Sequence, residues 1–254
     1  MRPLDKGNCP TDHHGKKKVV THYSAWRQDL INRIGYYCAY CNIPLSHSIQ
    51  VEHVVAKNPM PGHAAGSMLD WENMLLACGP CNNKKGNRPV SPAIQYLPEE
   101  HNTLLAFDIV AHSIHDDAAI VKPAPGLLNV QQKKAAATIK LLGLDKIDRR
   151  QKVVDIRWKK RRDAMIAVEA NHKLFLQATH SPTYDSAAAA QCIAEIAKPT
   201  GFFLLWFKAF ADQPSVMEKL IDNTIIPGTA QNCFDKANGY CLLLRNPGNL
   251  ADPF

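Results

Sequence analysis

The chain has 254 residues, of which 46% are apolar, so it can fill the core of one large domain or two small ones and is not disordered throughout. Its 30 Lys and Arg against 23 Asp and Glu give a formal net charge of +7, which favours polyanionic partners. The most apolar stretch, Gly201 to Phe210, is shorter than the roughly 18 residues of a membrane helix and contains Lys208. The first residues lack an apolar signal core, so we expect a cytoplasmic protein without a membrane segment.

Residues 1–35 are predicted to form an amino-terminal arm followed by one helix. The first twenty residues have no apolar period and carry the basic run Lys16 to Lys18, which is typical of a surface arm. From about Tyr23 to Ile34 apolar residues recur at helical spacing, and Gly35 follows as a helix stop.

Residues 36–91 are predicted to form a compact module of turns and short strands. This segment has few helical signals, several Gly and Pro residues, and two Cys-x-x-Cys pairs. A module of this size is not stable through burial of apolar surface alone, so it needs a further source of stability.

The two cysteine pairs predict a structural zinc site in this module. Cys38 pairs with Cys41, and Cys78 with Cys81, so that two tight turns can bring four thiolates to one tetrahedral Zn²⁺. With sulfur in all four positions, no position remains open for catalysis. Four buried free thiols and an iron–sulfur cluster are the alternatives.

Residues 92–254 are predicted to form a mostly helical accessory domain. We expect a strand over Leu104 to Asp108, a helix over Val130 to Leu142, and two helices within Gly201 to Leu220. A long basic helix, or two joined helices, is expected from Asp145 to about Ala178. For its basic residues, a solvated helix face and contact with phosphate are both open interpretations. These residues are Arg149, Arg150, Lys152, Arg157, Lys159, Lys160, Arg161 and Arg162.

Between and after the cysteine pairs, three chemical elements follow one another: Glu52-His53, then Asn73, then the run Asn82 to Lys85. With these residues, the segment from Tyr36 to Pro89 resembles the HNH endonucleases, the zinc-stapled branch of the ββα-metal nucleases. The resemblance implies an α+β fold in which a small ββα-metal (HNH) zinc module is followed by a mostly α-helical domain.

The resemblance implies that Glu52, His53 and Asn82 carry the chemistry. His53 would be the general base, because an imidazole with a reference pKa of about 6.5 can take a proton from water at neutral pH. Glu52 and Asn82 would hold one Mg²⁺ or Mn²⁺ at the scissile phosphate through oxygen donors. Glu52 stands where Asp is frequent in the family and Asn82 where His is frequent, which affects metal preference and rate.

Three further residues receive supporting roles from the same resemblance. Asn73 would hydrogen bond to the backbone of the strand that carries His53 and so fix the imidazole. Lys84 and Lys85 would contact phosphate or balance the charge that develops on it.

We therefore expect a metal-dependent endonuclease that hydrolyses phosphodiester bonds in DNA, as a nicking enzyme or as a homodimer that cuts both strands. An RNase or tRNase that uses the same site is an alternative, because no polymer-specific motif stands out. Another alternative is a catalytically silent zinc-stapled module that binds nucleic acid or protein. Glu52, His53 and Asn82 together argue against it, because a binding module needs no acidic residue beside a base.

A wider resemblance involves three segments outside the module. Met1 to Gly7, Ala137 to Asp145 and Pro227 to Asp235 look like parts of long bacterial HNH proteins. Some of these, such as the nuclease subunit of Septu-type anti-phage systems, work beside an ABC-type ATPase. The resemblance implies a role in antiviral defence, with the helical half as a docking platform for an ATPase partner.

Overall fold

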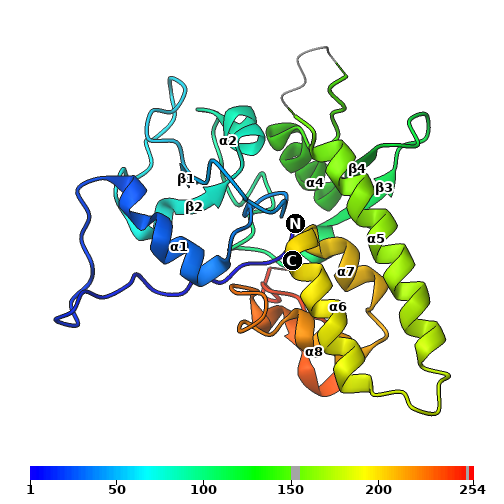
Figure 1. Ribbon diagram of the computed structural model, residues 1–254. Coiled ribbons are helices and arrows are strands. Elements are labelled where there is room, and N and C mark those ends of the chain that lie inside the picture. Colours follow the sequence, from blue (N-terminus) through cyan, green and yellow to red (C-terminus); the bar gives the residue numbers. More distant parts are fainter. Residues whose placement is uncertain (150–154, 250–251) are drawn as a thin grey trace.

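The computed structural model describes residues 1–149, 155–249 and 252–254. In these ranges, small two-stranded antiparallel sheets are set among helices, and the predicted α+β class is confirmed. Figure 1 shows the first helix beside the first sheet on one side of the molecule and the longer helices on the other. No helix within the described residues is long and apolar enough to cross a membrane.

The amino-terminal arm leads into a 3-10 turn, Tyr23–Trp26, and helix α1, Arg27–Ile34. This confirms the predicted helix, which buries Leu30, Ile31 and Ile34 and ends at Gly35 with a φ of 73°. The prediction of a surface arm is wrong for its first residues. Arg2 is buried, and its guanidinium donates hydrogen bonds to the carbonyl oxygens of Ile34 and Pro227, both at 2.8 Å.

The module between the cysteine pairs is built from two strands and a helix. Strand β1, Gln50–His53, pairs antiparallel with β2, Met74–Ala77, so that His53 lies opposite Met74. Every residue of β2 is buried. Helix α2, Gly79–Lys85, follows at once, because Pro80 in its first turn has no N–H to satisfy and a φ suited to a helix.

The second half contains helices, as predicted, together with two small hairpins that its amino-acid pattern did not predict. Its elements are α3 (Thr103–Ala106), β3 (Phe107–Ala111), β4 (Ala119–Pro123), α4 (Asn129–Leu142), α5 (Arg157–Ala178), α6 (Ser186–Thr200), α7 (Phe203–Ala209), α8 (Pro214–Leu220), β5 (Phe234–Asp235) and β6 (Cys241–Leu242). The predicted strand at Leu104 to Asp108 is wrong at its start. The side chain of Asn102 caps a helical turn there, and the strand begins only at Phe107.

The long basic helix begins later than predicted, at Arg157 instead of Asp145. Residues 145–149 are not helical, and Arg150 and Lys152 lie outside the described residues. Both interpretations of the basic run fail for Arg157 and Arg161, because their side chains are buried.

These two guanidiniums bind backbone carbonyls at the end of α4 and beyond it. Arg157 donates to the carbonyl oxygen of Leu142 at 3.0 Å, and Arg161 to that of Leu144 at 2.7 Å. The last carbonyls of a helix have no partner within it, so donors from α5 satisfy them. The two arginines thereby join α4 to α5.

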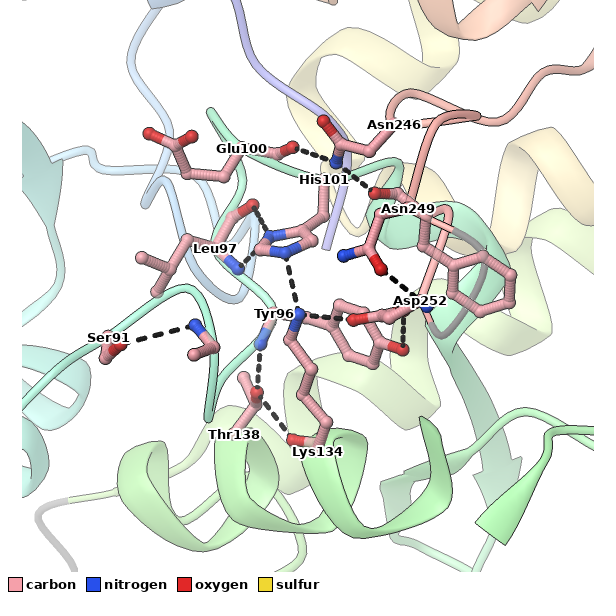
Figure 2. Close-up of polar contacts among 12 residues, drawn as sticks. Ser91, Tyr96, Leu97, Glu100, His101, Lys134, Thr138, Asn246, Asn249 and Asp252 are labelled. Carbon is pink, nitrogen blue, oxygen red and sulfur yellow. Dashed lines mark hydrogen bonds and ion pairs between the residues drawn. The ribbon is translucent and has the colours of Figure 1, made fainter. Parts of the chain in front are cut away.

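A buried polar cluster ties the end of the chain to α4 (Figure 2). Lys134 of α4 forms an ion pair with Asp252, and its ammonium lies 2.8 Å from Nε2 of His101. The hydroxyl of Tyr96 donates to the second oxygen of Asp252 at 2.7 Å. Burial, aided by the nearby ammonium, lowers the pKa of His101 to about 4, so the imidazole is neutral and accepts from Lys134.

One hydrophobic core runs through both halves of the chain. The ring of Tyr37, which precedes the first cysteine pair, meets that of Phe203 edge-on at 4.8 Å. Its hydroxyl donates to the carbonyl oxygen of Lys198 at 2.8 Å. On the other side, the indole of Trp71 donates to the carbonyl oxygen of Gly7 at 2.9 Å. The two-strand module is therefore packed between the arm and the helical half.

Candidate active site

The four predicted zinc ligands come together. Cys38 and Cys41 lie on a turn before β1, while Cys78 is the residue just before α2 and Cys81 lies in the first turn of that helix. All four are buried, and their sulfur atoms lie within 4.8 Å of one another. Two sulfurs at about 2.3 Å from a tetrahedral zinc are about 3.8 Å apart, and Sγ of Cys41 and of Cys78 are 3.7 Å apart. The cluster thus fits one tetrahedral ion.

Arg157 contacts this cluster from the helical half and was not singled out by its sequence. Its Nη1 donates to Sγ of Cys81 at 2.9 Å, and its Nη2 forms an ion pair with Asp155 at 2.7 Å. Although burial lowers the pKa of Arg157, the Cys81 thiolate and Asp155 together hold it above its ordinary value. A guanidinium here compensates part of the negative charge of four thiolates.

Glu52 of β1 is buried and held from two sides. The hydroxyl of Tyr40 donates to Oε1, and Nζ of Lys85 lies 3.5 Å from Oε2. Within the described part of the chain, no group donates a hydrogen bond to Oε2. Burial raises the pKa of Glu52 to about 7, against the opposing effects of Lys85 and the Tyr40 hydroxyl. This carboxylate therefore favours a bound cation.

His53 follows at the end of β1, with its imidazole oriented by a backbone carbonyl. Nε2 lies 3.1 Å from the carbonyl oxygen of Met68. Because a carbonyl only accepts hydrogen bonds, Nε2 carries the proton and Nδ1 has the free lone pair. The ring also packs against that of Tyr23, with 4.8 Å between centroids. Burial, with added repulsion from Lys57 and Lys85, lowers the pKa of His53. His53 is thus poised to accept a proton at Nδ1.

Asn73 pins the loop after β1 to the strand end. Its Oδ1 accepts from the backbone N–H of Val55 at 2.8 Å, and its Nδ2 donates to the carbonyl oxygens of Val55 and Ser67 at 3.0 and 2.8 Å. These bonds also position Met68, the hydrogen-bond partner of His53. Gly66 permits the arrangement, because a Cβ there would lie 2.2 Å from the Val55 carbonyl oxygen. No pattern in the sequence singled out Gly66.

Asn82 reaches the site from the first turns of α2. Its Nδ2 donates to Oε1 of Gln50 at 2.9 Å, which turns the amide nitrogen toward β1. The amide oxygen is not used in this bond, so it is available to a cation.

One cleft of about 420 Å³ is lined by Glu52, His53, Asn82 and Lys85. Asn73 lies outside this lining and acts on the backbone behind it. Lys84 is exposed and lies along Gly143, since a Cβ built at Gly143 would be 3.4 Å from its side chain. Contact of Lys84 with phosphate therefore stays a prediction, outside the lining of the cleft. Lys85 lines the cleft but is buried against Glu52, so its contact with phosphate stays a prediction.

The cleft combines a carboxylate, an imidazole and an amide oxygen on a ββα frame. Residues 38–88 match the HNH endonuclease family, so the chain contains an HNH endonuclease domain and the expected resemblance is confirmed at that level.

A stretch of 65 residues, 25% of this chain, is 35% identical to the CRISPR-associated endonuclease Cas9 of Corynebacterium diphtheriae. The stretch spans only 6% of that relative's length. No solved structure is significantly similar to the chain. The resemblance to the Septu subgroup stays a prediction.

Proposed function

We propose that the chain is a metal-dependent endonuclease that hydrolyses phosphodiester bonds of DNA. The observation that carries the proposal is the convergence of Glu52, His53 and Asn82 on one cleft of the HNH domain. A proton acceptor beside oxygen donors for a divalent ion is the set of groups that metal-assisted phosphodiester hydrolysis uses.

In this proposal, Nδ1 of His53 accepts a proton from the attacking water. The Met68 carbonyl accepts from Nε2 and so stabilises the imidazolium that forms. Glu52 and Asn82 would hold Mg²⁺ or Mn²⁺ through their oxygens. When bound, the ion supplies positive charge to the scissile phosphate and to the leaving 3′-oxygen. Lys57, whose ammonium lies 4.9 Å from the ring centre of Tyr23, adds positive charge at the cleft.

For the four-cysteine cluster we propose zinc with a structural role. The sulfurs are buried and spaced for one ion, and four thiolates leave no open position for water.

The test is cleavage of supercoiled plasmid by the zinc-loaded protein with Mg²⁺, Mn²⁺ or EDTA. His53→Ala should abolish cleavage with zinc content and melting temperature unchanged, whereas His63→Ala, an exposed histidine of the same domain, should cut like wild type. Cleavage retained by His53→Ala would refute the mechanism. Parallel assays with structured RNA separate a DNase from an RNase, and no cutting of either polymer by wild type would favour a binding module.

A role in anti-phage defence beside an ABC-type ATPase, and action as a homodimer, are proposed on the wider resemblance alone. An ATPase that co-purifies with the chain and stimulates plasmid cleavage would support the partnership. Sedimentation with and without DNA tests for the dimer.

A further inference from the structure

The ion pair between Glu52 and Lys85 has an unusual setting for a metal site. Both side chains are about 2% exposed, and Nζ of Lys85 lies 3.5 Å from Oε2 of Glu52 inside the cleft. The other carboxylate oxygen, Oε1, is taken by the Tyr40 hydroxyl. The lysine thus faces the one oxygen of Glu52 that no hydrogen-bond donor in the described chain satisfies.

A divalent ion held by Glu52 would need that same oxygen. A metal bound at about 2.1 Å from Oε2 would lie within a few ångströms of the ammonium, since the ammonium is itself only 3.5 Å from this oxygen. Two cations at such a distance repel one another strongly where water is excluded. The ammonium and the metal therefore compete for one carboxylate.

We propose that Lys85 is a resident counter-ion of the catalytic metal site, which compensates Glu52 in the empty site and moves away from it when a divalent ion binds. This inference rests on the proposed function, because it takes Glu52 as a metal ligand. Lys85 thereby sets the affinity of the site for the metal, which is a role distinct from binding substrate.

The proposal has a consequence for substrate. The displaced ammonium and the metal together bring more positive charge into the cleft than Glu52 balances. A phosphodiester supplies negative charge at that point, so it favours the metal-bound state. Metal and nucleic acid are therefore expected to bind cooperatively, and the free protein to bind the metal weakly.

The first experiment measures Mn²⁺ binding without DNA, by the electron paramagnetic resonance signal of free Mn²⁺, on zinc-loaded full-length protein. Lys85→Met should bind Mn²⁺ about tenfold more tightly than wild type or more, because an uncompensated buried carboxylate gains most from a cation. Lys84→Met is the matched control, since its exposed side chain lies outside the cleft, and its affinity should stay within about twofold of wild type. Glu52→Gln should weaken binding.

The second experiment compares wild type with Lys85→Met, and its wild-type measurement does not depend on any variant folding. Addition of a DNA duplex with phosphorothioate linkages, which slow hydrolysis, should tighten Mn²⁺ binding about tenfold or more. The same duplex should tighten binding to Lys85→Met much less. Zinc content and melting temperature establish that each variant is folded.

Unchanged or weaker Mn²⁺ binding by folded Lys85→Met would overturn the inference, as would wild-type affinity that does not respond to DNA. Wild-type Mn²⁺ affinity in Glu52→Gln would also overturn the inference, because the inference takes Glu52 as a metal ligand. These experiments measure Mn²⁺ occupancy, whereas the plasmid assay measures a cleavage rate, so the two can fail separately. A failure of the plasmid assay would refute the nuclease activity, and the Mn²⁺ measurements would still be judged on their own.

Discussion

Replacement of Arg157 by Met should remove the polar contacts that join the helical half to the four-cysteine cluster. In the folded protein this buried guanidinium contacts Sγ of Cys81, the carboxylate of Asp155, and the carbonyl oxygens of Leu142 and Gly143 at 3.0 and 3.2 Å. Met fills a similar volume but donates no hydrogen bond. The variant leaves buried acceptors and an unpaired carboxylate, which we expect to cost about 3–5 kcal/mol of unfolding free energy.

The assay is equilibrium unfolding in urea, followed by circular dichroism, with zinc release recorded by a colorimetric chelator. Arg162→Met is the matched control on the same helix, because Arg162 is partly exposed and donates to one carbonyl oxygen, that of Asp116. Its cost should stay below about 1 kcal/mol. In Arg157→Met, zinc should be released at lower urea than in the control. Equal stability of the two variants would refute the link between α5 and the cluster.

Three more predictions concern the cleft and the tail. At saturating Mg²⁺, which keeps Glu52 ionised, single-turnover cleavage should fall as pH drops through the pKa of His53, with its midpoint below the ordinary imidazole value of 6.5, because burial favours the neutral base; a midpoint above 6.5 under these conditions would contradict this. Asn73→Ala should slow cleavage about 10- to 100-fold with zinc content intact, since Met68 no longer orients His53. A wild-type rate would show that the loop after β1 keeps its conformation without Asn73. Lys134→Met should lower the unfolding free energy by about 3 kcal/mol, because Asp252 loses its buried cation and keeps only the Tyr96 hydroxyl. Lys133→Met, on the exposed side of α4, serves as the control in the same urea titration.

The candidate site residues can be predicted because they lie in short sequence motifs. Each cysteine pair spans one turn, and Glu52-His53 is a single step at a strand end, so local pattern suffices to find them. Their resemblance to the HNH endonucleases then implies the ββα frame.

Contacts that depend on distant segments were beyond such reasoning. Arg157 lies 76 residues from Cys81, and nothing near Arg157 marks it as a neighbour of the thiolates. Lys85 resembles Lys84 in sequence, yet α2 turns the first into the cleft and the second toward Gly143. Helical spacing separates adjacent residues by about 100°, so only the packing of α2 decides which lysine is buried.

Local competition explains the errors in secondary structure. The apolar run from Leu104 fits a strand, but Asn102 offers its side chain to the backbone and starts a helical turn first. The basic run after Asp145 has helical composition, yet the left-handed φ of 60° at Gly143 ends α4, residues 145–149 are not helical, and α5 begins at Arg157.

The core that runs through both halves means that the HNH module is not a portable unit. A fragment of residues 36–91 would keep all four cysteines but lose Arg157 beside Cys81, the carbonyl of Lys198 that binds Tyr37, and the carbonyl of Gly7 that binds Trp71. Large aromatic faces would then meet water. Grafting this module into another protein would require transplanting surfaces from both ends of the chain, so the HNH domain and the helical half are a single structural unit.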